Sequence, residues 1–174
     1  MTDATRPYRL MALNNAWANA RFYHAMRGMG PVEFRQKRPG FFPTLRATMN
    51  HIHTVDLYYI DALTGGGQGA ALRDRAETRD VPTLAQAQAD SDARLCAFCD
   101  ALTPEGLAET RITERDSGPV PERVEMLLLH LFQHQIHHRG QAHVQLQTTG
   151  ILPPQLDEFY LDYDRAPSAL DYLG

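Results

Sequence analysis

Four segments of helical length constrain the fold of this chain most. In each of them apolar residues recur at steps of three and four, and Pro or Gly stands at or near both ends. Such spacing is typical of helices that bury one face, and Pro and Gly favour helix starts and stops. We therefore predict helices over residues 8–29, 43–63, 82–102 and 121–149.

The apolar positions predict which helix faces are buried. On the first helix the stripe contains Leu10, Leu13, Trp17, Ala20 and His24, and on the second it contains Leu45, Met49, Ile52, Tyr59 and Leu63. The polar segment "TGGGQGAALRDRAETRDVPT" between the second and third helices is long enough to cross from one end of a bundle to the other. The prediction is an all-α, four-helix bundle with a long crossover connection, formed as a single domain over residues 1–174.

Two smaller elements complete the expected fold. A short hairpin can form between about Ile112 and Val120, because Gly118 and Pro119 lie between them. The acidic, aromatic-rich tail after Gly150 is expected to pack across the bundle without regular structure.

Charge and composition exclude several classes of partner. The net charge is −4 and the basic side chains are scattered, so we expect no nucleic acid partner, which would need clustered positive charge. No apolar run approaches the roughly 20 residues that span a bilayer, and the N-terminus lacks the pattern of a signal peptide. We expect a cytoplasmic protein without membrane contact, in which Cys96 and Cys99 are packed thiols on a helix.

Five of the eight histidines lie between His130 and His143. At about 100° per residue, His130, His134, His137 and His138 share one arc of about 100°, and His143 lies on the opposite side. Side chains at i and i+4 reach the same point, which allows two imidazoles to bind one ion at about 2.0–2.1 Å. Both the pair His130/His134 and the pair His134/His138 have this spacing.

We favour metal binding over a buried hydrogen-bond network or a solvated polar face, because each buried imidazole would need its own partner. A third ligand can come from "MNHIHTVD" in the second helix, where periodicity does not separate His51 from His53. Asp56 lies on the apolar stripe of that helix. We expect it to be paired, either with a ligand histidine or with an arginine.

The motifs "NAWANARF", "TMNHIHTVD" and "LLLHLFQHQIHHRGQAH" resemble the DinB/YfiT-like family of metal-dependent proteins over most of the chain. The resemblance implies a bundle with a crossed connection and a divalent metal held by His51, His134 and His138. It places His130 beside the ligands, and it does not carry His53 or His137 over as ligands.

Gly140 lies within the histidine-rich motif, in the middle of the fourth predicted helix. Glycine inside a helix costs about 1 kcal/mol relative to alanine. We therefore expect a close helix contact at this residue.

Three neutral imidazoles leave a coordination position open, which is characteristic of catalytic rather than structural metal sites. Relatives of this fold include a mycothiol-dependent maleylpyruvate isomerase and bacillithiol transferases. The resemblance therefore implies transfer of a low-molecular-weight thiol to an electrophilic small-molecule substrate. Metal-assisted hydrolysis and a non-catalytic, metal-binding stress-response protein are the alternatives.

The sequence leaves the metal and the catalytic residues open. Zinc or nickel is expected first, and iron or copper also suits imidazole ligands. Tyr58, Tyr59, Asp56 and Gln141 are candidates for a general base, and none of them stands out. The aromatic residues Trp17, Phe22, Phe159, Tyr160 and Tyr163 exceed what one small bundle needs, and with the resemblance they predict a homodimer.

Overall fold

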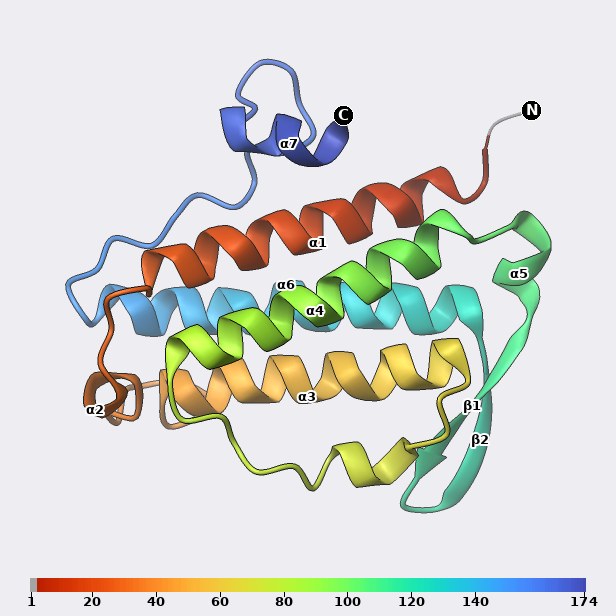
Figure 1. Cartoon of the computed structure of the whole chain (residues 1–174), viewed down its shortest axis with the longest axis horizontal. Helices are drawn as coiled ribbons and strands as arrows, with labels where there is room; N and C mark the ends of the chain where they lie inside the picture. The colour runs from red at the N-terminus through yellow and green to blue at the C-terminus, as the bar shows by residue number, and fades with distance from the viewer. Residues whose placement is uncertain (1–2) are drawn as a thin grey trace.

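The computed structural model describes residues 3–174, and it confirms the all-α prediction. The four long helices are α1 (Arg6–Ala25), α3 (Leu45–Thr64), α4 (Val81–Asp100) and α6 (Val124–Gln147) (Figure 1). Each begins and ends within a few residues of its prediction. The short helical elements are α2 (Pro31–Phe34), η1 (Gly69–Leu72), α5 (Pro104–Ala108), η2 (Pro167–Ala169) and α7 (Leu170–Leu173).

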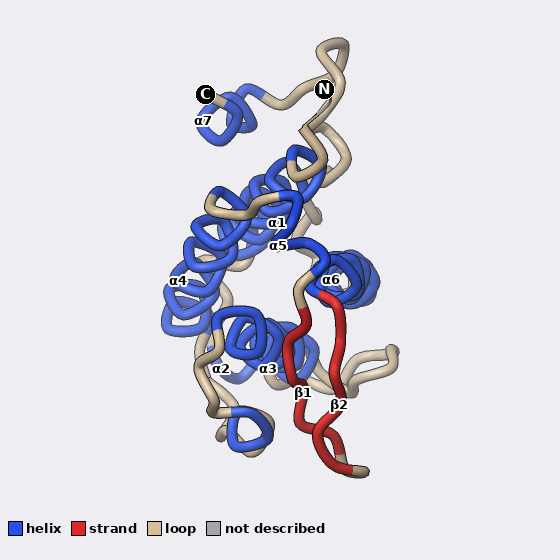
Figure 2. The backbone as a smooth tube through the Cα atoms, turned by 90° about the vertical axis from the view of Figure 1, so that its right-hand side faces the viewer, coloured by secondary structure: helices blue, strands red, loops and turns tan. Residues whose placement is uncertain are grey.

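Helix α1 packs against α4, and α3 packs against both α4 and α6. Figure 2 shows the bundle nearly end on, with the hairpin beside α3 and α6. Helices α3 and α4 run in the same direction, opposite to α1 and α6 (Figure 1). Parallel neighbours cannot be joined by a short turn, so residues 65–80 return along the bundle. This segment is the predicted crossover.

Asn50 and Thr78 fix the far end of the crossover. The amide nitrogen of Asn50 donates to the Thr78 carbonyl at 3.0 Å, and the Thr78 N–H donates to Asn50 Oδ1 at 2.7 Å. Side-chain caps then set the helix starts: Thr44 accepts from Ala47 N–H before α3, and Asp80 accepts from Thr83 N–H before α4.

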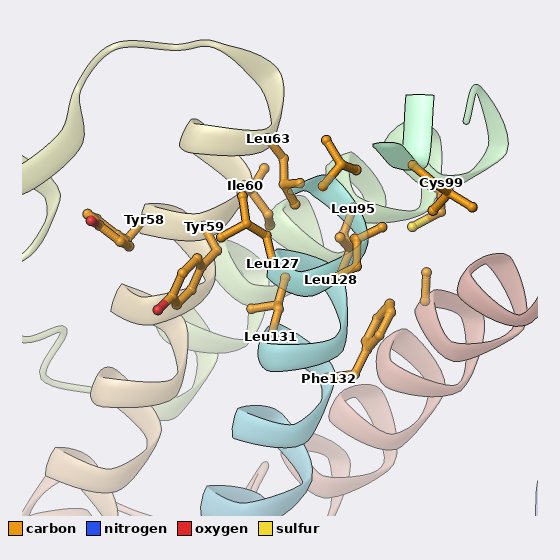
Figure 3. Packing of buried hydrophobic residues seen from close by; sticks show 13 residues of the cluster. Tyr58, Tyr59, Ile60, Leu63, Leu95, Cys99, Leu127, Leu128, Leu131 and Phe132 are labelled. Atoms are coloured by element: carbon orange, nitrogen blue, oxygen red, sulfur yellow. The ribbon is translucent and has the colours of Figure 1, made fainter. Parts of the chain in front are cut away.

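The core between α3, α4 and α6 contains Ile60, Leu63, Leu95, Leu127 and Leu131, all of them buried (Figure 3). Every residue of the stripe predicted for the second helix is buried. Apolar periodicity therefore identified the inner face of α3.

The stripe predicted for the first helix is wrong in part. Ala20 and His24 are exposed, whereas Asn15 and Asn19 are buried. Both asparagine amides donate to the carboxylate of Asp92 on α4, at 3.0–3.1 Å. The inner face of α1 thus includes a polar row that apolar periodicity does not detect.

The hairpin is longer than predicted. Strand β1 (Thr110–Arg115) pairs antiparallel with β2 (Gly118–Arg123), and Ile112 lies opposite Pro121. The two strands lie between α5 and α6 in the chain and leave the bundle at one end (Figure 1).

The tail adds a small cluster on α1. The ring of Phe159 lies 5.3 Å from the ring of Trp17, and Trp17 Nε1 donates to Ser168 Oγ at 3.0 Å. Phe159 and Trp17 are both buried, as is Phe22. Three of the aromatic residues on which the dimer prediction rested are therefore used inside the chain.

Gly140 does not lie in a close helix contact. A Cβ atom at this position would meet no other atom within 4 Å. The expectation of close packing is therefore wrong, because the glycine lies on an exposed part of α6.

The two cysteines lie on α4 as free thiols, Cys99 buried and Cys96 half-buried. Burial raises the pKa of Cys96 to about 11 and the pKa of Cys99 to about 12. Both are therefore thiols at neutral pH.

The membrane prediction concerns helix length and hydropathy. Within residues 3–174, none of the helices combines the length and the apolar character that crossing a membrane requires.

Candidate metal centre

The structure brings together His51 of α3 with His134 and His138 of α6. One nitrogen from each ring lies within 4.8 Å of the other two. Ring centroids are 4.9 Å apart for His51 and His134, 4.6 Å for His51 and His138, and 4.4 Å for His134 and His138. These are the three residues that the family resemblance singled out.

Local structure explains this convergence. His134 and His138 are one helical turn apart on α6, so their rings lie one above the other. Helix α3 packs along α6, and this contact places His51 opposite the pair. His51 Nε2 and His134 Nε2 are only 3.0 Å apart.

The ring nitrogens that face one another, such as His51 Nε2 and His134 Nε2, suit a cation. His134 Nδ1 is buried and has no hydrogen-bond partner within residues 3–174. His138 Nδ1 is 2.8 Å from Gln141 Oε1, a contact in which the ring nitrogen donates and its Nε2 keeps a lone pair. Three neutral imidazoles with free lone pairs at this spacing form a donor set suited to a divalent transition metal.

Electrostatics keep these rings neutral. Burial, together with repulsion from neighbouring histidines, lowers the pKa of His51 to about 4 and the pKa of His134 to about 3. Burial also lowers the pKa of His138, although its bond to Gln141 opposes the change. At neutral pH the three imidazoles are unprotonated, which is the form that binds metal.

Aromatic rings cover one side of the cluster. Phe42, on the loop before α3, lies 4.5 Å from His51 and 5.6 Å from His138 between ring centroids. Phe41 lies 6.3 Å from His138 and is 75% exposed. The approach to the histidines therefore passes apolar groups on this side.

Two further histidines flank the cluster. His130 lies 6.3 Å from His134 and packs against the ring of Tyr59 at 5.1 Å. His137 lies 4.8 Å from His138, and its Nε2 is 3.0 Å from Gln141 Nε2. Gln141 thus links His137 to His138.

His53 and His143 lie outside the cluster. His53 is buried toward α4, where its Nε2 is 3.2 Å from Ser91 Oγ. His143 Nε2 is 3.1 Å from the Pro154 carbonyl oxygen. The structure thus separates His51 from His53, which periodicity did not.

The expected partners of Asp56 are wrong. Its Oδ2 accepts hydrogen bonds from the amides of Gln88, at 2.6 Å, and Gln135. It makes no hydrogen bond to a histidine and no ion pair to an arginine within residues 3–174. Burial raises its pKa to about 7, against the opposing effect of the two amides.

The other three general-base candidates differ in whether they contact the histidine cluster. Tyr58 Oη donates to the Glu114 carbonyl, and Tyr59 Oη accepts from Arg115 at 3.3 Å. Gln141 is therefore the candidate that touches a ring of the cluster.

Sequence reasoning missed a buried polar network behind the cluster. Arg139 donates to Asn15 at 2.9 Å, to Asn19 at 2.8 Å and to Gln135 at 3.2 Å. Its guanidinium is buried, and burial lowers its pKa to about 10. The i,i+4 pair Asn15 and Asn19, set among the apolar residues of α1, is the signal that could have revealed it.

The fold and the site together define a class of helical bundle, in which an i,i+4 histidine pair of one helix meets a histidine of its neighbour. Within that class the chain belongs to the DinB family, whose model matches residues 1–167. It is 22% identical over 143 residues to Protein DinB of Bacillus subtilis (strain 168), covering 78% of this chain and 82% of that protein.

Two crystal structures share the fold. A DinB-like protein from Bacillus cereus ATCC 10987 superposes with a TM-score of 0.62 at 18% identity, over 80% of this chain and 90% of that one. The DinB-like protein YjoA from Bacillus subtilis gives 0.63 at 18% identity, over 84% and 96%.

Proposed function

We propose that this protein is a metal-dependent enzyme that transfers a low-molecular-weight thiol to an electrophilic small molecule. The observation that carries the proposal is the convergence of His51, His134 and His138, with one nitrogen of each within 4.8 Å of the others. Zinc or nickel is our first choice of metal, and iron or copper is compatible with the same ligands.

His51, His134 and His138 would hold the divalent ion, which would supply Lewis-acid chemistry that lowers the pKa of a thiol or a water. The protein's own part is to hold the rings neutral and oriented, which burial and Gln141 achieve. In the transfer to a substrate such as 1-chloro-2,4-dinitrobenzene, the S–H bond breaks, the sulfur forms a bond to the electrophilic carbon, the C–Cl bond breaks with its electron pair leaving on chloride, and the thiol proton must be accepted by a base. We assign that acceptance to His130, which lies beside His134 and has no hydrogen-bond partner within residues 3–174.

The surroundings favour thiol transfer over hydrolysis. In metal hydrolases of the H-E-x-x-H type, a carboxylate is the general base for the attacking water. Within residues 3–174 the cluster holds histidines and no carboxylate, and Asp56 is bonded to two buried amides. The flanking Phe41 and Phe42 suit an apolar electrophile.

The first experiment measures the metal content of protein purified without an affinity tag. A panel of low-molecular-weight thiols is then offered with 1-chloro-2,4-dinitrobenzene, and adduct formation is followed by absorbance. We expect one metal per chain and turnover that is lost on chelation and restored by the metal.

The outcomes separate the alternatives. Metal binding with ester hydrolysis and no thiol transfer would favour the hydrolase. Metal binding without any turnover would favour a binding protein. A wild-type protein that takes up none of these metals would refute the metal centre.

A further inference from the structure

A cavity lies between α1 and α4. The residues that line it include none of the clustered histidines, which belong to α3 and α6. Figures 1 and 2 show how these four helices are arranged. The volume of the cavity is about 510 Å³, and Tyr172 of α7 lies at one edge. Five of the fifteen residues that line it are alanines with small side chains, namely Ala16, Ala20, Ala85, Ala89 and Ala93. We call it the α1–α4 cavity.

The cavity also has buried polar groups that lack partners. Tyr23 and Gln88 line it, and they are only 5% and 1% exposed. Tyr23 Oη and Gln88 Oε1 make no hydrogen bond in the part of the chain that the structure describes. Buried polar atoms are rarely left unpaired, so each of them calls for a ligand or a water.

A buried carboxylate lies beside these two groups. Asp92 lines the cavity and accepts hydrogen bonds from the neutral amides of Asn15, Asn19 and Gln88. It forms no ion pair within 4.0 Å with any arginine, lysine or histidine of residues 3–174. Asp92 Oδ2 accepts one bond, from Asn19, and so retains a lone pair.

The surrounding network does not compensate this charge fully. Asp56 and Asp92 are both buried, whereas the network contains one buried cation, Arg139. Its guanidinium bonds to amide oxygens rather than to either carboxylate. Burial raises the pKa of Asp56 to about 7, and burial together with Asp56 raises the pKa of Asp92 to about 8, so a further cation beside them is needed before both carboxyls ionise at neutral pH.

We propose that the α1–α4 cavity binds the primary ammonium group of a small aliphatic amine. An ammonium has three N–H donors and no acceptor. Residues that line the cavity carry three acceptors, namely Asp92 Oδ2, Gln88 Oε1 and Tyr23 Oη; the last two are covered by protein atoms and would have to turn toward the amine on binding. The alkyl chain would lie against the alanine walls.

The basic side chains that line the cavity do not prevent binding of a cation. His24 and Arg27 line one end of the cavity, but both are exposed to solvent, where salt screens their charge. The apolar walls alone would accept any hydrocarbon. The unpaired acceptors and the carboxylate are what would select a cationic donor over a neutral one.

The test uses n-pentylamine as the probe and 1-pentanol as its neutral counterpart, each titrated into the full-length protein by calorimetry and NMR. We expect saturable binding of the amine that is at least tenfold tighter than binding of the alcohol. Asp92→Asn should weaken amine binding at least tenfold. Tyr23→Phe removes one acceptor and should weaken it roughly threefold to tenfold.

A matched pair on α4 tests the location. Ala89→Leu fills the cavity and should abolish amine binding, whereas Ala97→Leu places the same side chain on an exposed site outside it and should not. Circular dichroism checks that each variant folds, and Tyr23→Phe keeps the test decisive where Asp92→Asn does not fold. None of these residues belongs to the histidine cluster, so metal content should stay at the wild-type value.

Three results would overturn the proposal. Equal affinity for pentanol and pentylamine would make the cavity a purely apolar groove. If the wild type does not bind the amine, a primary ammonium is not the ligand of the unpaired groups. A change from dimer to monomer in Ala89→Leu, with no amine binding to the wild type, would make the groove a contact between two copies of the chain.

Discussion

At the scale of single residues, His134 has the central position in the proposed metal centre. Its ring centroid lies 4.9 Å from that of His51 and 4.4 Å from that of His138, and its Nδ1 is buried without a partner in residues 3–174. Changing a residue that only orients a metal ligand costs about 10–100-fold in affinity. We therefore predict that His134→Ala and His138→Ala each weaken zinc binding by more than about 100-fold, measured by competition with a chelating dye.

The matched controls are other histidines. His143→Ala should bind zinc as the wild type does, because that ring contacts Pro154 instead of the cluster. His51→Ala should weaken binding more than His53→Ala, whose ring faces Ser91. Equal losses of zinc affinity in all five variants would indicate general unfolding, and the prediction would then fail.

Asp56 gives a prediction about pH. Burial raises its pKa from 3.8 to about 7, so the folded protein keeps a proton that the unfolded chain has released between these values. The contribution of Asp56 to stability therefore falls as pH rises from about 4 to 7, and the full penalty is present above 7. Asp56→Asn removes the penalty for a buried, ionised carboxylate. The stability of the variant relative to the wild type should therefore increase as pH rises from about 4 to 7.

The size of this effect follows from proton affinity. A shift of one pKa unit is a tenfold change in proton affinity and corresponds to about 1.4 kcal/mol. The free energies of unfolding of Asp56→Asn and the wild type should therefore differ by on the order of a few kcal/mol at pH 8. Urea unfolding of both proteins at pH 4 and pH 8 measures it. A constant difference at the two pH values would contradict the prediction, and Asp90→Asn, an exposed carboxylate on α4, is the control.

The limits of sequence reasoning are also visible at this scale. Helical period placed His134 and His138 on one arc, but it left His130 equally eligible and could not choose between His51 and His53. That choice depends on how α3 is rotated against α6. The partners of Asp56 were beyond reach for the same reason, because they are amides from two other helices.

At the scale of elements, helix ends were easier to predict than helix faces. Pro, Gly and capping side chains act locally, and the observed caps at Thr44 and Asp80 follow that chemistry. The inner face of α1 was misread because Asn15 and Asn19 are buried against Asp92. Buried polar residues of this kind become interpretable only when their partners are known.

Gly140 of α6 gives a prediction about the stability of the protein. No atom lies within 4 Å of where its Cβ would be, and its φ is not in the left-handed region. Glycine in a helix is about 0.5–1 kcal/mol less favourable than alanine, so Gly140→Ala should stabilise the protein by about that amount. Chemical denaturation measures it.

The control is Gly65, which ends α3 with a φ of 69°. Alanine is strained in that conformation, so Gly65→Ala should destabilise the protein. Destabilisation by Gly140→Ala would indicate a role for the glycine that packing does not show.

At the scale of the whole molecule, the crossover was predictable and the tail was not. A polar segment as long as residues 65–80 implies that the helices it joins need not be antiparallel neighbours. The tail has no comparable pattern, and yet Phe159 is fully buried against Trp17. A single aromatic anchor after several turns leaves too little periodicity to be recognised in advance.

The homodimer remains a prediction, but the structure changes its basis. Trp17, Phe22 and Phe159 are buried in their own chain, so they cannot form an interface. Exposed apolar side chains instead follow one face of α6, within an arc of about 80°. They are Met126, Leu129, Ile136 and Val144, each more than half exposed. Exposed apolar patches of this kind mark protein contacts.

We therefore predict that two chains associate through this face of α6. Light scattering should give about twice the 19.6 kDa of one chain. The double variant Leu129→Glu and Ile136→Glu should give the monomer, because charges buried at an apolar interface are costly. Leu161→Glu, which alters an exposed leucine of the tail, should leave the dimer intact. A wild-type protein that stays monomeric at high concentration would show that the exposed stripe has another role.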